Sequence, residues 1–315
     1  MSQISTEILK QGYQRKRILA CSFFTMQDSY RPFEKYQRQL LRFLRQIKVL
    51  KNFEFRIYTD DTGKDFCLEN VKDPAVSIIK FDCPEFREGR GHTGTFGTLA
   101  RFLPLFEDHE IVWVADIDIP DAFVDPINLS EMLDNHCDFK ISSRVCYDRK
   151  SYGRRHTIEA GRFISSVQIP RQLLTRFINK LLDGSYAKEL DALNAENKRK
   201  NPSRFPYGVD ELFLNYPVYD WMRKRDYNVF VETDMLVTSM LTQNTEIPPE
   251  SKQLLLEFYY DPLKNKKLVP KLKIMYKKYI PLILDLYPCL QVFLDKLDSF
   301  KDDFNEKLFI KSSEL

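Results

Sequence analysis

The 315-residue chain contains 43% hydrophobic and 30% charged residues, and its formal net charge is +3. These values are ordinary for a globular protein, and so small a charge argues against a nucleic-acid-binding protein, which usually shows a strongly basic face. No stretch reaches the roughly 18 consecutive apolar residues of a membrane span, and residues 1–17 lack the apolar core of a signal peptide, so we expect a cytoplasmic protein in a cellular, bacterial or viral setting.

Apolar runs and helical patterns alternate in the first third of the chain. Strands are predicted at 17–25, 53–59 and 76–81, and a helix is predicted from Phe33, where apolar residues recur every three or four positions. The glycine-rich segment 89–97 precedes a predicted short helix in TLARFLPLF. Because it does not follow the first strand, this segment is not a dinucleotide fingerprint. We interpret it as a loop beside the site, and favour a structural turn over the alternative of a phosphate cradle.

The stretch IVWVADIDIP, residues 111–120, leads an apolar run directly into Asp116 and Asp118. Its large apolar residues without polar alternation predict a strand that is buried on both faces. Ligands of open α/β sheets bind at the carboxyl ends of the strands. Side chains two residues apart in extended chain share a face, so both carboxylates could bind one hard cation. The alternative is an acidic turn that caps a core strand.

The next part of the chain predicts further strands at 138–145 and 161–170, a helix that ends near Gly184, and a charged, solvated segment at 187–204. In YGVDELFLN, residues 207–215, Gly208 leads the chain into an apolar run beside Asp210 and Glu211. One acid could cap a helix while the other faces a cleft, although an N-terminal acidic cap alone would explain both. Residues 229–237 resemble a closing strand.

The character of the sequence changes after Pro248. Residues 264–280 are rich in lysine, and a stripe with helical spacing follows at Phe293, Leu297, Phe300, Phe304 and Leu308. We therefore predict a helical C-terminal extension, residues 246–315, that packs on the domain formed by residues 1–245. Such a basic segment could instead make a peripheral contact with an anionic membrane or a partner protein.

Several landmarks resemble one enzyme group when they are taken in order over residues 15–240. They are SFFTMQDSY, YTDD, GTLARFLPLF, VWVADIDI, SSVQIP and YGVDELFLN. Their layout resembles the GT-A glycosyltransferases, most closely the glycogenin-like and bacterial galactosyltransferase group, family eight. The resemblance implies an α/β fold with a Rossmann-like, mostly parallel central sheet flanked by helices. It also implies metal-dependent transfer of a sugar from a nucleotide-sugar donor, favouring a UDP-sugar and retention of configuration, to a hydroxyl of a glycan, protein or small molecule.

The resemblance also implies roles for individual residues. Asp116 would meet Mn²⁺ or Mg²⁺ or the ribose, and Asp118 would coordinate the metal. Arg101 would support the first aspartate or the donor sugar, and Asp210 and Glu211 would lie at the sugar and acceptor, so we assign these three to catalysis. The residues assigned to nucleotide-sugar binding are Phe24, Thr25, Asp28, Tyr30, Asp60, Arg101, Asp116 and Ile117.

One departure from that family concerns the metal site. The family usually supplies a histidine ligand near the end of the domain, whereas the four histidines here all precede residue 157. Either another residue such as Asp234 takes that role, or the site binds metal more weakly, or it binds none. Carboxylate-held Mn²⁺ or Mg²⁺ would neutralise charge on a diphosphate leaving group, and an inverting enzyme would also need a general base such as Asp210 or Glu211.

Two alternative functions remain open. A nucleotidyltransferase would make sugar nucleotides on a similar sheet, but its usual glycine-rich, basic segment after the first strand is absent from SFFTMQDSY. The other alternative is a degenerate transferase fold that serves as a binding or scaffold protein, which the missing late histidine favours. Four acids at one end of a sheet argue against it, because they would repel one another unless a cation or ligand held them.

Overall fold

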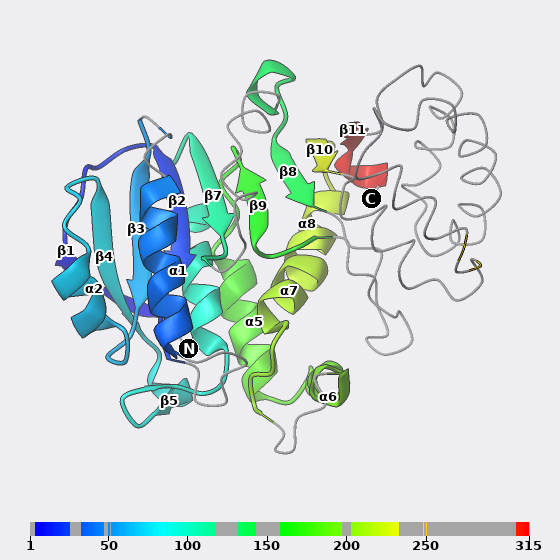
Figure 1. The fold of residues 1–315 in the computed structure, drawn as a ribbon. Helices are drawn as coiled ribbons and strands as arrows, with labels where there is room; N and C mark the ends of the chain where they lie inside the picture. Colours follow the sequence, from blue (N-terminus) through cyan, green and yellow to red (C-terminus); the bar gives the residue numbers. More distant parts are fainter. Residues whose placement is uncertain are drawn as a thin grey trace.

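The computed structural model describes the chain at residues 4–25, 33–46, 50, 52–117, 132–142, 158–196, 203–232, 248, 250 and 307–314. These residues form an α/β fold with a large, mostly parallel mixed sheet flanked by helices (Figure 1). The strands of this sheet are β1 Ser5–Lys10, β2 Arg17–Ser22, β3 Glu54–Thr59, β4 Val76–Asp82, β7 Ile111–Ala115, β8 Phe139–Ser142, β9 Arg162–Ser165, β10 Asn228–Glu232 and β11 Lys307–Lys311. A small hairpin pairs β5 Arg87–Glu88 with β6 Gly91–His92.

The order of strands in the described sheet is β1-β4-β3-β2-β7-β9-β8-β10-β11. Six of these strands run in one direction, whereas β1, β9 and β11 run in the other. From β2 the chain builds outward through β3 and β4 on one side and then returns to add β7 on the other. A ligand crevice is expected where the strand order reverses in this way, at the carboxyl ends of β2 and β7.

Helices cover both faces of the sheet. Leu19 and Cys21 of β2 face one layer of helices, and Ile18 and Ala20 face the other, as the twofold alternation of a strand requires. All five residues of β7 are buried, which confirms the prediction of a strand covered on both faces. The first layer contains α1 Phe33–Gln46 and α2 Lys64–Asn70, and the second contains α5 Gln172–Leu182, α6 Ala187–Glu196, α7 Val209–Phe213 and α8 Tyr219–Arg223.

Tighter and wider helical turns complete the described elements. The predicted short helix before β7 is present as a 3₁₀ helix, η3, and a π-helical turn, η4, joins α7 to α8 in one continuous rod. Their bounds are η2 Pro84–Phe86, η3 Phe96–Phe106, η4 Leu214–Val218 and η6 Ser312–Glu314. The four described cysteines, at 21, 67, 83 and 137, are buried and unpaired, and none of the helices in the described part is long and apolar enough to cross a membrane.

Four sequence predictions about the fold were incomplete or wrong. Strand β1 was missed because its residues are largely exposed and it forms by edge pairing with β4. The segment predicted as solvated contains α6, which buries Leu193. β10 does not close the sheet, since β11 pairs beyond it. Leu308 lies in β11, so its place in a helical stripe was wrong; residues 251–306 of the predicted extension lie outside the described part.

Candidate functional site

A single arginine joins three segments at the carboxyl end of β7. Arg101 lies on η3 and is only 3% exposed. Its Nη1 donates to the Ala115 carbonyl oxygen at 3.2 Å and to Asp116 Oδ1, and its Nη2 donates to Asp210 Oδ2 at 2.6 Å. The structure therefore brings together the predicted residues Arg101, Asp116 and Asp210, although they are far apart in sequence.

Burial and charge act against each other in this cluster. Burial alone would lower the pKa of Arg101, but Asp116 and Asp210 raise it above its usual value, so the guanidinium stays charged. Burial raises the pKa of Asp210, and the neighbouring Asp116 adds to this, while Arg101 opposes it. A buried carboxylate whose pKa is raised can exchange a proton nearer to neutral pH than an exposed aspartate can.

Asp116 is placed by its partner strand as well as by Arg101. Its backbone N–H donates to the Gly161 carbonyl oxygen at 3.3 Å, immediately before β9 pairs with β7. A Cβ atom on Gly161 would lie 2.1 Å from Asp116 Oδ2. Residue 161 must therefore be glycine for the carboxylate to occupy this position. Within the described residues, the Asp116 carboxylate accepts its hydrogen bond at Oδ1, and its side chain is 26% exposed, so no described donor occupies Oδ2.

A small cavity of about 70 Å³ adjoins these groups. It has room for about two waters, which is less than the roughly 300–1,000 Å³ of a usual ligand site. Arg101 Nε is buried and has no hydrogen-bond partner in the described structure. The cavity is lined by Ser22, Phe23, Phe24, Tyr36, Thr95, Thr98, Arg101, Asp116, Ile117, Ala160, Gly161, Tyr207, Gly208, Asp210 and Glu211.

Helix α7 carries the two acids of the second landmark. It begins after Gly208, whose φ of +98° suits glycine, and Asp210 and Glu211 lie buried in its first turn. Asp210 Oδ1 accepts the Glu211 N–H at 3.1 Å. The Asn215 side chain donates to the carbonyl oxygens of Glu211 and Ile158. Because Asp210 also binds Arg101, it is more than the simple acidic cap of the alternative interpretation.

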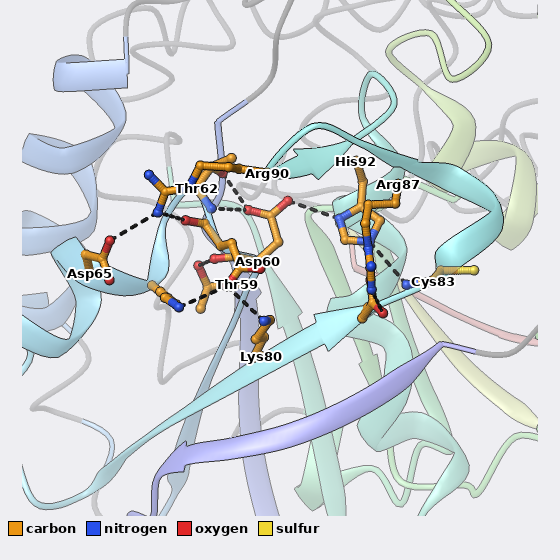
Figure 2. A network of polar contacts seen from close by, with 12 residues as sticks. Thr59, Asp60, Thr62, Asp65, Lys80, Cys83, Arg87, Arg90 and His92 are labelled. Atoms are coloured by element: carbon orange, nitrogen blue, oxygen red, sulfur yellow. Dashed lines mark hydrogen bonds and ion pairs between the residues drawn. The ribbon is translucent and has the colours of Figure 1, made fainter.

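The predicted binding residue Asp60 uses its carboxylate within the protein. Asp60 is 1% exposed, and Figure 2 shows Thr62 and His92 pointing toward it. Its Oδ1 accepts hydrogen bonds from the Thr62 N–H and hydroxyl, and its Oδ2 lies 3.1 Å from His92 Nδ1. Asp60 does not line the Arg101 cavity, so the structure places it in a supporting network.

The hydrogen bonds of His92 define its tautomer. His92 Nε2 accepts the Cys83 N–H at 3.1 Å, so Nδ1 carries the proton and donates it to Asp60 (Figure 2). Asp82 Oδ1 also lies 3.3 Å from Nε2. A nitrogen that accepts from a backbone N–H cannot donate to that carboxylate as well, so we assign the donated ring proton to Nδ1.

This network reaches the loop that follows β2. The Thr62 hydroxyl donates to Asp60 and accepts the Thr25 N–H at 2.8 Å. Thr25 is thus held through its backbone, and its neighbour Phe24 lines the cavity and packs so closely on Gly97 that a Cβ there would lie 2.6 Å from the Phe24 ring. Ile117 also lines the cavity. The remaining predicted residues, Asp28, Tyr30, Asp118 and Asp234, lie outside the described residues.

The glycine-rich segment supports the cavity by packing. Gly94 has a φ of +53°, and a Cβ on it would lie 2.2 Å from the Phe205 carbonyl oxygen. The Thr95 hydroxyl donates toward the carbonyl oxygens of Phe205 and Pro206, just before Tyr207. These contacts are those of a structural turn, as predicted. The sequence reasoning did not name Thr95, Tyr207 or Gly161 as site residues. Signals were present, since Thr95 lies in the glycine-rich segment, Tyr207 begins YGVDELFLN and Gly161 begins a predicted strand.

No group of three or more His, Cys, Asp or Glu side chains is arranged to hold a metal ion within the part of the chain that the structure describes. Asp118 and Asp234, which the sequence analysis named as candidate metal ligands, lie outside the described residues. Comparison with known proteins found no matching family model and no matching curated protein.

Proposed function

We propose that this protein is a metal-dependent glycosyltransferase of the GT-A type, which moves a sugar from a nucleotide-sugar donor to a hydroxyl acceptor. The observation that carries the proposal is the Arg101 bridge between Asp116 and Asp210. It lies at the carboxyl end of β7, beside β2, where the strand order reverses and where α/β sheets bind their ligands. The order of sequence landmarks supplies the donor class, for which we propose a UDP-sugar.

The charge balance of the cavity supports a divalent cation. Three carboxylates, Asp116, Asp210 and Glu211, line it beside the single guanidinium of Arg101. A nucleotide diphosphate is itself anionic, and it would be repelled by this excess of negative charge. Mn²⁺ or Mg²⁺ prefers oxygen ligands, and no described donor occupies Asp116 Oδ2. We assign Asp116 and Asp118 to hold the ion, which when bound would neutralise charge on the departing diphosphate.

The chain's own residues orient the reacting groups. Arg101 holds Asp116 and Asp210 at fixed positions, and its Nε remains able to donate to a ligand in the cavity. Because burial raises the pKa of Asp210, this carboxylate is suited to accept a proton from the acceptor hydroxyl in an inverting reaction. Glu211 is the second acid on the acceptor side. The family resemblance favours retention, in which a base of that kind is not required.

A thermal-shift experiment tests the proposal. We expect UDP with Mn²⁺ to stabilise the protein by about 2.7 kcal/mol at a ligand concentration of 100 times Kd. Asp118→Ala should abolish this stabilisation while leaving the unliganded protein folded. Asp134→Ala, a change at an exposed aspartate, is the matched control and should retain it.

Turnover separates the enzyme from its alternatives. Release of UDP from a UDP-sugar onto water or an added hydroxyl acceptor supports a transferase. Release of pyrophosphate from a nucleoside triphosphate and a sugar phosphate would instead indicate a nucleotidyltransferase. Nucleotide binding with neither reaction would indicate a binding protein, and no binding of any nucleoside diphosphate with Mn²⁺ would overturn the proposal.

A further inference from the structure

A second cavity, of about 500 Å³, lies between α5 and the rod formed by α7, η4 and α8. It shares no residue with the Arg101 cavity, and its volume is in the usual range of ligand sites. We call it the cationic groove. It is lined by Leu173, Arg176, Phe177, Lys180, Tyr186, Tyr216, Pro217, Asp220, Trp221, Lys224 and Arg225.

The π-helical turn shapes one wall of the cationic groove. Within η4, Leu214, Asn215 and Val218 are buried, whereas Tyr216 and Pro217 are partly exposed and line the groove. π-Helical turns are rare and occur frequently at functional sites. The same rod carries Asp210 and Glu211 in its first turn, so a molecule bound in the groove would rest on the helix that holds the acids of the Arg101 cavity.

Aromatic rings form the floor of the cationic groove. The centroids of Phe177 and Tyr186 are 5.2 Å apart, and Tyr186 meets Tyr216 edge to face at 5.7 Å. Trp221 is largely buried beside them. Rings fixed in this way offer apolar surface at little cost in conformational entropy.

Four positive side chains surround this floor. Arg176 and Lys180 project from α5, and Lys224 and Arg225 follow α8, all of them exposed. Within the described residues none of the four makes an ion pair, although Lys180 lies 5.8 Å from the Tyr186 ring and Arg225 4.8 Å from the Trp221 ring. Asp220 is the single acid in the lining. Asp183 lies close enough to Lys180 to interact with its charge, and Arg225 Nη1 donates to the Trp221 carbonyl oxygen at 3.0 Å. The groove therefore presents an excess of positive charge over the acid in its lining.

A purely structural explanation is that these cations stabilise the negative C-terminal ends of helix dipoles. It suits Lys180 in the last turn of α5 and Lys224 just after α8. It does not account for Arg176 in the middle of α5 or for the aromatic floor. In another cavity, beside β3, the lining residue Arg56 forms ion pairs with Glu54 and Glu107. The cations of the cationic groove differ from it, because they have no such ion pair among the described residues.

We propose that the cationic groove binds an acidic peptide segment of a partner protein, with an apolar side chain of the peptide against the aromatic floor and its carboxylates against the four cations. Clusters of arginine recognise acidic motifs in this manner, and complementary charge gives such contacts their specificity. A single-stranded nucleic acid fits less well, because it needs stacking surfaces along a continuous basic track, whereas the four cations here lie around one compartment. The inference does not depend on the proposed transferase activity.

The test uses the whole chain and a fluorescent peptide of glutamates around one central phenylalanine. We expect saturable binding by fluorescence anisotropy at low ionic strength. Arg176→Glu combined with Lys180→Glu should weaken it about tenfold or more, since attraction becomes repulsion. The matched control combines Lys35→Glu with Arg38→Glu on α1, which packs on the opposite face of the sheet. Because these charges are distant from the groove and screened by salt, we expect the control to change peptide binding less than twofold.

A second reporter keeps the test independent of one variant. The protein has two tryptophans, and in a Trp113→Phe background the peptide should change the fluorescence of Trp221. Lys224→Glu alone should weaken binding if the double variant does not fold. Absence of saturable binding, or equal weakening by the α1 control, would overturn the proposal. Stronger binding of inorganic phosphate or of a single-stranded oligonucleotide than of the peptide would overturn the assignment to a peptide.

Discussion

In the Arg101 cavity two carboxylates neutralise a buried guanidinium, whereas in the cationic groove four exposed cations have no ion-pair partner among the described residues. Water explains the difference. An ion removed from water loses several kcal/mol of hydration and must find its partners within the protein, but an exposed ion keeps its hydration. The first region is therefore a rigid, internally balanced cluster that sets geometry, and the second is suited to attract a charged partner from solution.

Removing the buried cation should have the largest effect on the protein. Arg101→Met leaves the buried Asp210 and the partly buried Asp116 without a counter-charge, and we expect the free energy of unfolding to fall by about 3–5 kcal/mol. Arg176→Met in the cationic groove is the matched change and should cost less than about 0.5 kcal/mol. Urea denaturation of both variants measures the contrast. Similar values for the two would show that the cluster and the groove do not differ in the way described.

Filling the space beside Asp116 should have an intermediate effect. A methyl group on Gly161 would overlap Asp116 Oδ2, and overpacking of this kind typically costs about 1–3 kcal/mol. Gly161→Ala should therefore lower the free energy of unfolding and weaken binding of UDP with Mn²⁺. In an Asp116→Ala background the same substitution should cost clearly less, and an unchanged cost would exclude the contact with the carboxylate as the cause.

The smallest expected effect is a pH dependence that belongs to the buried region. Since the pKa of Asp210 is raised in the folded protein, the native state keeps a proton that the unfolded chain has released. The contribution of protonated Asp210 to the free energy of unfolding is fully present below the ordinary pKa of aspartate. It is lost as pH rises through the raised pKa of Asp210. Asp210→Asn should flatten this decline. Unfolding free energies measured across that pH range would contradict the assignment if both proteins declined equally.

The main features of the fold could be predicted from the sequence because they depend on local patterns of apolar residues. The apolar run of β7 predicted that strand, and apolar residues at every third or fourth position predicted α1 and α5. All three elements are present. Strands β1 and β11 were missed because their pairing partners, β4 and β10, are distant in sequence. An edge strand has few buried residues and so leaves a weak periodic signal.

The candidate site was predicted in part for a similar reason. Asp116, Asp210 and Glu211 were chosen from their positions at element ends, and Arg101 from the resemblance to a known family. That Arg101 contacts both aspartates, and that Gly161 makes room for one of them, depends on side chains from three segments that meet only in the fold. Asp60 shows the opposite case, since a plausible ligand-binding acid is used inside the protein by Thr62 and His92.

The amino-acid sequence by itself determined that this chain forms an α/β sheet and that aspartates follow its central strand, because hydrophobic periodicity and strand ends are local properties. Only the tertiary structure decided which charges are neutralised and which remain available. Burial and ion pairing depend on segments far apart in the chain, as the Arg101 bridge and the four cations of the cationic groove demonstrate. The electrostatic character of both regions is therefore a property of the folded protein.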